Sequence, residues 1–187
     1  MQEEIDLLFE ITKEAMVHSL EHLNHELAKI RAGKASTSMI DELRVEYYGN
    51  PSPINQVATV ATADARTITI QPWEKSMLGP IEKSIFEANL GITPMNDGQL
   101  IRLTLPPMTE ERRKDLVKNA KKLGEDAKVG IRSARHKAMD TIKKAVKDGY
   151  PEDAGKRSEA RVEEMTQAYY KKVDVMMEAK EKDIMTV

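Results

Sequence analysis

The segment 109–148 has the pattern that most constrains the fold of this chain. Its apolar residues recur in steps of three and four, which places them along one face of a continuous α-helix. About forty residues at about 1.5 Å each make a helix on the order of 60 Å long. A helix of this length can bury such a stripe only against other long helices. The stripe consists of Leu116, Ala120, Leu123, Ala127, Ile131, Ala134, Ala138, Ile142 and Ala145.

Two further segments are amphipathic in the same way, about 3–31 and about 152–184. None of the three segments could bury its apolar face alone, so together they predict an elongated antiparallel three-helix bundle. Gly149 and Pro151 end the middle helix. The apolar faces are Ile5, Leu8, Ala15, Leu20, Leu23, Leu27 and Ile30 in the first helix, and Val162, Met165, Tyr169, Val173, Met176 and Ala179 in the third.

Residues 32–108 have a different pattern, with short alternating runs separated by turns. Gly49–Pro53 is expected to be a turn, because glycine, asparagine and proline cluster there. The runs predict a small β/α domain. Strands are expected at Leu43–Tyr48, Ile54–Val60, Thr67–Ile70 and Leu100–Leu105, and a short helix at Lys75–Asn89.

The fold class is therefore α+β, with two domains. Residues 1–31 and 109–187 are expected to form the discontinuous bundle, and residues 32–108 the inserted β/α domain. Two short chain crossings join them, and a glycine in one and a proline pair in the other are typical of a hinge. The expected hinge residues are Arg31, Ala32, Gly33, Leu105, Pro106 and Pro107.

Composition excludes several classes of function. The chain has no cysteine, so disulfides, thiolate metal sites and a cysteine nucleophile are excluded. No stretch approaches the roughly 18 consecutive apolar residues of a membrane span. The acidic first ten residues do not resemble a secretory signal, and cytoplasmic localisation is expected. No glycine-rich phosphate loop, Gly-x-Ser-x-Gly or His-Glu-x-x-His motif occurs, so neither an enzyme nor a cofactor is expected.

Charge is distributed unevenly along the chain. The formal net charge is −2, yet residues 109–148 hold thirteen Lys and Arg against seven Asp and Glu. The cations form a stripe that we expect to face solvent, opposite the apolar one. Such a stripe is either a solvated helix face or a binding surface for RNA phosphates, and Arg132 with Arg135 favours the RNA interpretation. The stripe is Lys114, Lys118, Lys121, Lys128, Arg132 and Arg135, interrupted by Glu125.

Two other groups of residues have weaker functional interpretations. His18, His22 and His25 lie on one side of the first helix. A metal site there is less favoured than an exposed polar face, because no carboxylate pattern completes it. Tyr47, Tyr48 and Trp73 are expected to belong to the core of the small domain, each with a polar group at its edge. A partner contact at Trp73, which follows Pro72, is the less favoured alternative.

Six sequence strings follow one another along the chain in a specific order and spacing. They are Arg31–Ser36 (RAGKAS), Val45–Gly49 (VEYYG), Ile81–Ile85 (IEKSI), Leu90-Gly91, Leu105–Arg113 (LPPMTEERR) and Glu125–Arg135 (EDAKVGIRSAR). Together they resemble the bacterial ribosome recycling factor family over nearly the whole chain. That family commonly has alanine where Gly130 stands, and the glycine costs about 1 kcal/mol in helix propensity.

The resemblance implies an L-shaped two-domain monomer that enters the post-termination 70S ribosome. With elongation factor G and GTP hydrolysis, it would promote dissociation into subunits. The bundle would lie on large-subunit ribosomal RNA, and the small domain would swing about the hinge. Arg132 and Arg135 match the family's paired RNA-contacting arginines. Lys128, on the same stripe, is a further candidate. Arg31 matches the arginine at the domain junction, and Arg112 and Arg113 match the basic pair after the hinge.

A second interpretation uses a different surface. The chain could be a helical scaffold or chaperone-like module that binds a partner protein through a methionine-rich face of the third helix. This face would consist of Met165, Met176 and Met177.

Overall fold

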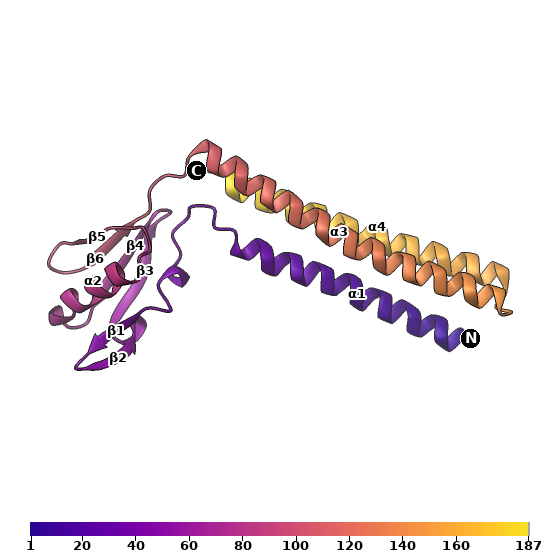
Figure 1. Cartoon of the computed structure of the whole chain (residues 1–187), viewed down its shortest axis with the longest axis horizontal. Helices are drawn as coiled ribbons and strands as arrows, with labels where there is room; N and C mark the ends of the chain where they lie inside the picture. The colour runs from indigo at the N-terminus through magenta and orange to yellow at the C-terminus, as the bar shows by residue number, and fades with distance from the viewer. Residues whose placement is uncertain (187) are drawn as a thin grey trace. The chain divides into compact units, whose positions relative to one another are not determined.

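The structure, a computed structural model, describes residues 1–186 and consists of two compact units. One unit contains Met1–Ala32 and the chain from Glu110 onward, and the other contains Gly33–Thr109. The first is entirely helical, whereas the second contains all the strands (Figure 1).

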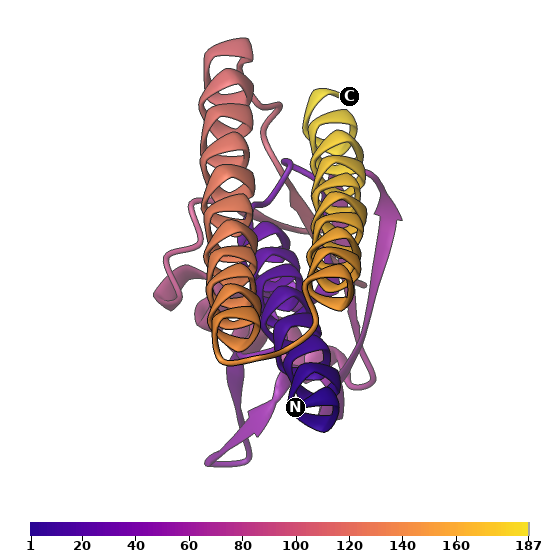
Figure 2. The same ribbon diagram turned by 90° about the vertical axis from the view of Figure 1, so that its right-hand side faces the viewer.

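Three long helices make up the first unit. They are α1 (Gln2–Lys29), α3 (Glu110–Lys147) and α4 (Glu152–Met185). α3 packs against both α1 and α4 and runs antiparallel to each of them (Figures 1 and 2). The predicted three-helix bundle is confirmed, and each helix begins and ends within two residues of the expected position.

The buried face of α3 is almost entirely the predicted one. Three positions differ, because Gly124 is buried although it was not expected to be, and Leu123 and Ala145 are only half-buried. Small residues dominate this face, so the neighbouring helices approach α3 closely. The buried residues are Leu116, Ala120, Gly124, Ala127, Ile131, Ala134, Ala138 and Ile142.

The predicted faces of α1 and α4 are partly wrong. Ala15 and Ala179 are exposed. Burial follows an alternation of four and three residues, as in a coiled coil, and this register includes polar positions. The hydroxyl of Thr12 donates to the Leu8 carbonyl at 2.7 Å, which satisfies it inside the helix. The buried residues are Ile5, Phe9, Thr12, Met16, Leu23 and Leu27 of α1, and Gly155, Ser158, Val162, Thr166, Tyr169, Val173 and Ile184 of α4.

Gly130 lies where α1 and α3 come close together. A Cβ atom at this position would lie 2.6 Å from Oγ of Ser19. The glycine therefore makes room for the serine hydroxyl, which donates to the Ala15 carbonyl at 3.3 Å.

We expect the effect of Gly130→Ala on stability to depend on Ser19. In the native background the collision with Oγ offsets the roughly 1 kcal/mol gained in helix propensity. In a Ser19→Ala background that gain is realised in full and raises the melting temperature. Thermal unfolding of the four variants measures the coupling, and equal effects of Gly130→Ala in both backgrounds would contradict it.

The turn between α3 and α4 is tight. Gly149 has a φ of +107°, which favours glycine. The Tyr150 hydroxyl donates to Oε1 of Gln2 at 3.1 Å and ties the turn to α1. Early in α4, Gly155 lies so close to α3 that a Cβ atom there would collide with Cγ2 of Val146. Glycine at 155 therefore permits the close packing of the two helices.

The second unit contains six strands and one α-helix. They are β1 (Arg44–Tyr47), β2 (Asn50–Pro53), β3 (Ala58–Asp64), β4 (Thr67–Pro72), α2 (Leu78–Glu87), β5 (Pro94–Asn96) and β6 (Ile101–Thr104). The strands form a four-stranded antiparallel sheet in the order β3-β4-β6-β5 and a two-stranded sheet β1-β2. The core lies where α2 contributes Ile81 and Ile85 and the larger sheet contributes Ile68, Ile70 and Leu103. This confirms the α+β class.

Two local predictions in this unit are wrong, and one strand was missed. Gly49–Pro53 is not a turn, since Asn50–Pro53 pairs with β1 and only two residues connect the strands. Those residues, Tyr48 and Gly49, have φ values of 47° and 83°, as in a type I′ hairpin. Ile54–Gln56 is a short 3-10 helix rather than strand. The strand Pro94–Asn96 was not expected at all.

Candidate nucleic-acid interface

Three of the predicted cations on α3 face α4 and carry partners. Nζ of Lys121 lies 3.9 Å from Oε1 of Glu181, and Nζ of Lys128 lies 2.7 Å from Oδ1 of Asp174. Nε of Arg135 lies 2.6 Å from Oε2 of Glu163. We call these three ion pairs the seam pairs. The expectation that the whole basic stripe points away from the bundle is therefore wrong.

The reason is the heptad register of α3. Lys121, Lys128 and Arg135 each follow a buried alanine by one residue and repeat every seven positions. Positions of this kind flank the buried seam of a coiled coil and pair with the neighbouring helix. The acids of α4 meet them there.

The seam pairs shift the pKa of two of their members. The hydrogen bond from Arg135, followed by one from Gln167, lowers the pKa of the Glu163 carboxyl. The hydrogen bond to Asp174 raises the pKa of the Lys128 ammonium. Both groups are therefore charged at neutral pH, but ion pairs this exposed contribute only about 0–1 kcal/mol to stability.

Arg132 differs from these residues. It follows Ile131, on the side of α3 away from the seam, and its side chain is exposed. Within residues 1–186 no hydrogen bond, ion pair or ring contact engages it. Arg132 is thus a guanidinium fully available to an external anion, while Arg135 in the next turn is half-buried and paired.

The other three residues that were expected to contact RNA lie at helix ends of the same unit. Arg31 is exposed just after α1, and Arg112 is exposed in the first turn of α3. Arg113 is half-buried, and among the described residues its buried Nε atom has no hydrogen-bond partner. The structure therefore places all six residues that were expected to contact RNA in the helical unit. Arg31, Arg112 and Arg113 are remote in sequence from Lys128, Arg132 and Arg135.

The three histidines predicted on one side of α1 lie at its surface. His18, His22 and His25 are all exposed, and within the part of the chain that the structure describes, no cluster of His, Cys, Asp and Glu could hold a metal ion. His18 and His22 line a surface hollow of about 280 Å³ between α1 and α3, together with Glu26 and Asp126.

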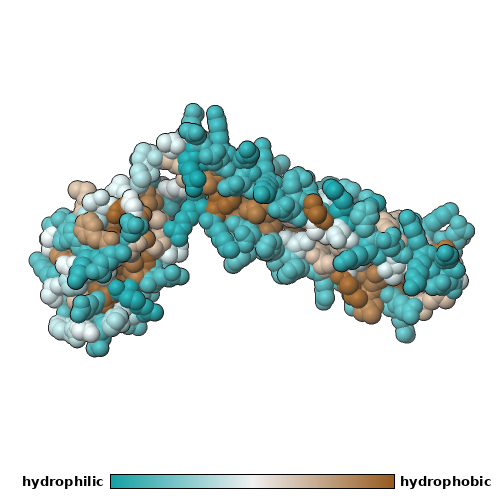
Figure 3. Space-filling view, in the orientation of Figure 1, coloured by the Kyte–Doolittle hydropathy of each residue, from teal (hydrophilic) through white to brown (hydrophobic). Residues whose placement is uncertain are grey.

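The methionine-rich face of α4 is not a free surface. Met165, Met176 and Met177 are half-buried. Met165 packs against the core near the α3–α4 turn, and the sulfur of Met177 lies over Gly124. Met177 thus fills the space left by Gly124, and all three side chains are half-buried, which does not favour the scaffold interpretation. Hydrophilic side chains cover most of the visible face of the helices in Figure 3, with hydrophobic ones in narrow bands.

The aromatic residues of the small unit are more exposed than expected. Tyr48 is 76 % exposed and Trp73 is 65 % exposed, so the prediction that both belong to the core is wrong. Only Tyr47 packs partly against the core. The hydroxyls of Tyr47 and Tyr48 both donate to the Glu74 carboxylate, at 3.1 and 3.0 Å.

Glu74 holds the pKa of both tyrosines above the ordinary value, because each phenol loses its hydrogen bond to the carboxylate when it ionises. The stabilisation from these bonds is present below the ordinary tyrosine pKa of about 10. It is lost as the pH rises through the raised value. We expect Glu74→Gln to lower both pKa values in an NMR titration, and unchanged titration curves would contradict this arrangement.

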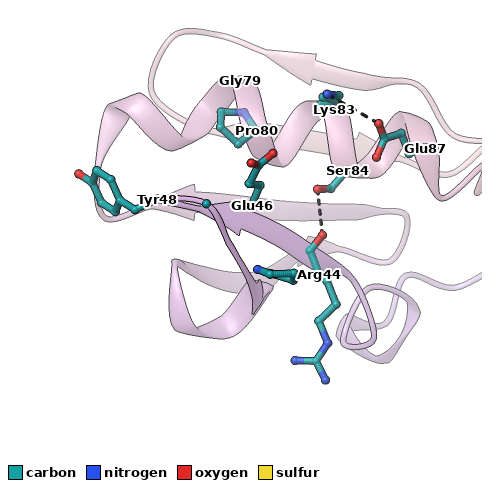
Figure 4. Close-up of a pocket in the computed structure, with 10 residues that line it drawn as sticks. Arg44, Glu46, Tyr48, Gly79, Pro80, Lys83, Ser84 and Glu87 are labelled. Carbon is teal, nitrogen blue, oxygen red and sulfur yellow. Dashed lines mark hydrogen bonds and ion pairs between the residues drawn. The ribbon is translucent and has the colours of Figure 1, made fainter.

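An open hollow of about 660 Å³ lies between the β1–β2 hairpin and α2 (Figure 4). Its lining mixes charges of both signs, including Arg44, Glu46 and Lys83. The hydroxyl of Ser84 donates to the Arg44 carbonyl at 3.0 Å, and Lys83 pairs with Glu87 at 3.9 Å. The Ser84 hydroxyl is thus engaged with the backbone of β1, and the Lys83 ammonium with an acid of its own helix. Among residues 1–186, none of the helices combines the length and the apolar character that a membrane crossing requires.

Comparisons with known proteins agree with the sequence strings. A family model for ribosome recycling factor matches residues 23–185. The ribosome-recycling factor of Trichlorobacter lovleyi is 53% identical over 176 residues, covering 94% of this chain and 95% of that protein. That of Flavobacterium johnsoniae is 50% identical over the full length of both chains.

Two solved structures have the same fold. A solution structure of ribosome recycling factor has a TM-score of 0.70 at 38% identity and covers 98% of each chain. A T. thermophilus ribosome recycling factor, described with E. coli elongation factor G as bound to the E. coli post-termination complex, has a TM-score of 0.58 at 40% identity. It covers 97% of this chain and 99% of its own. By sequence and by fold, this chain belongs to the ribosome recycling factor family.

Proposed function

We propose that this protein binds the post-termination 70S ribosome in the cytoplasm and, with elongation factor G and GTP hydrolysis, promotes its dissociation into subunits. The observation that carries the proposal is the likeness, over nearly the whole chain, to a recycling factor described together with elongation factor G on that complex. The protein itself acts as a monomer, without cofactor or covalent chemistry.

The helical unit would supply the contact with large-subunit ribosomal RNA. Arg132 is the strongest candidate, because it is exposed and without a partner among residues 1–186. Arg135 and Lys128 would contribute from the seam. Arg31 and the Arg112–Arg113 pair would extend the contact at the helix ends. Arginine is well suited to phosphate, since its guanidinium can donate two parallel hydrogen bonds.

The two chain crossings would act as the hinge. The residues are Arg31, Ala32 and Gly33 at the first crossing, and Leu105, Pro106 and Pro107 at the second. Gly33 has a φ of +73°, and a Cβ atom there would lie 2.9 Å from Cε of Met108. Leu105 is anchored in the small unit, because it is buried and its N–H donates to the Arg66 carbonyl at 2.7 Å. The backbone rotations at the second crossing would therefore occur after Leu105 in the sequence, at Pro106 and Pro107.

A subunit-splitting assay tests the function. Post-termination 70S ribosomes are incubated with the protein, elongation factor G and GTP, and the products are separated on a sucrose gradient. We expect 30S and 50S peaks only when all three are present, and none with a non-hydrolysable GTP analogue. Intact 70S ribosomes in the complete reaction would contradict the proposal.

The hinge is tested in the same assay by a cross-link. The chain has no cysteine, so one cysteine introduced in each unit gives the only disulfide possible within one chain. We expect the oxidised protein to bind ribosomes normally but not to split them, and reduction of the same sample to restore splitting. Equal splitting by the oxidised and reduced forms would show that hinge motion is not required.

A further inference from the structure

The guanidinium of Arg135 is held in one orientation by α4. Its Nε atom donates to Oε2 of Glu163 at 2.6 Å. The two side chains are 31% and 42% exposed, so the pair lies at the edge of the bundle rather than inside it. This bond fixes the plane of the guanidinium relative to the seam between α3 and α4.

Glu163 is itself held by a second residue. Nε2 of Gln167, one turn later in α4, donates to Oε1 of Glu163 at 3.3 Å. Each carboxylate oxygen therefore has its own donor, one from α3 and one from α4. The carboxylate is restrained from both sides, and so is the arginine that it holds.

The hydrogen bond to Glu163 leaves the two terminal nitrogens of the Arg135 guanidinium available for a ligand. It engages Nε, while within residues 1–186 no hydrogen bond reaches the terminal nitrogens Nη1 and Nη2. These two nitrogens carry the N–H groups that can grip a phosphate in a fork. An arginine held by Nε has already lost much of the side-chain freedom that binding would otherwise remove. Arg132, which no residue of the described chain restrains, must lose that freedom when it binds.

We propose that Glu163, held by Gln167, is a positioning residue that presents the Nη edge of Arg135 to a phosphate of ribosomal RNA. The proposal rests on the proposed function, in which α3 docks on RNA. It deepens that function by assigning a role to an acidic residue on a different helix.

The direction in which removal of Glu163 changes the affinity for RNA distinguishes a positioning role from simple electrostatic repulsion. An acid beside an RNA-binding surface repels phosphates, so its removal should tighten binding. If Glu163 positions Arg135, its removal weakens binding although a negative charge is lost. Glu164, the next residue, is an exposed acid with no partner in the described chain and provides the matched control.

The test is a double-mutant cycle on binding of the full-length protein to 70S ribosomes at several salt concentrations. We expect Glu163→Ala to weaken binding about threefold to tenfold, and Glu164→Ala to leave it unchanged or tighter. Glu163→Gln should retain most of the affinity, since its amide oxygen can still accept from Nε. In an Arg135→Ala background, Glu163→Ala should have no weakening effect.

Each outcome separates the possible roles. Tighter binding by Glu163→Ala, or the same weakening with and without Arg135, overturns the positioning role. A lowered melting temperature together with an effect independent of Arg135 would show a merely structural role and also overturn it. If neither Arg132→Ala nor Arg135→Ala weakens binding, the docking of α3 on RNA fails as well. If only Arg132→Ala weakens binding, the docking stands and the role of Glu163 is rejected.

Discussion

Replacing Arg132 by alanine will weaken ribosome binding by about tenfold to a hundredfold. The loss corresponds to roughly 1.5–3 kcal/mol, the usual contribution of hydrogen bonds to a charged group. One phosphate contact fewer should also reduce the slope of log affinity against log salt by about one unit. The melting temperature should stay near that of the native protein, because Arg132 is exposed and makes no contact within residues 1–186.

Arg157→Ala is a suitable control, because Arg157 is an exposed arginine of α4 and its replacement removes the same charge from another helix. Binding titrations at four or five salt concentrations measure affinity and slope together. An Arg132→Ala protein that binds like the Arg157→Ala protein at every salt concentration would exclude a specific phosphate contact at Arg132.

Replacing Gly155 by alanine will destabilise the helical unit by about 1–3 kcal/mol, the range typical of overpacked cores. Alanine is the better helix former by up to about 1 kcal/mol, yet its Cβ atom would collide with Cγ2 of Val146. Valine is stiff at χ1 within a helix, so the side chain cannot turn away. The two helices must therefore separate or bend.

Val146→Ala should relieve this collision. We expect the double variant to be more stable than the sum of the two single effects predicts, as measured by thermal or urea unfolding. Gly79→Ala is the matched control, because Gly79 is also helical but a Cβ atom there meets nothing within 4 Å. If Gly155→Ala and Gly79→Ala have equal effects, the packing at Gly155 is not tight.

The bundle could be predicted because its information is local and repeats many times. Each helix has several turns of apolar spacing, and glycine and proline mark the end of α3. The faces of α1 and α4 were harder, because the buried register includes residues such as Thr12 and Gly155. Apolarity does not mark these residues, and only the regular alternation of four and three does.

The small unit was less predictable, because its strands are short and their pairing depends on residues far apart in the sequence. Pro51 and Pro53 argued for a turn, yet β2 belongs to a sheet of only two strands and has a free edge. A proline is tolerated there, because its missing N–H can lie on the unpaired side. The three residues of β5 are too few to show an alternating pattern.

The charge pattern identified α3 as the candidate RNA-binding helix but not the difference between its arginines. Arg132 and Arg135 look equivalent in the sequence, since both follow a buried residue. Which of them faces a neighbour depends on the side of α3 on which α4 lies. The heptad position of Arg135, seven residues after Lys128, was the available signal. To predict the ion pair, that position would also have had to be matched with an acidic residue of α4, Glu163.

The order of the elements along the chain has a consequence for synthesis. α1 ends at Lys29 and its partner α3 begins only at Glu110, after the whole small unit. At about 5–20 residues per second, the apolar face of α1 waits several seconds after translation before anything can cover it. The small unit has its own core and can fold in that interval. A nascent α1 is therefore the part of this protein most exposed to chaperones and to aggregation.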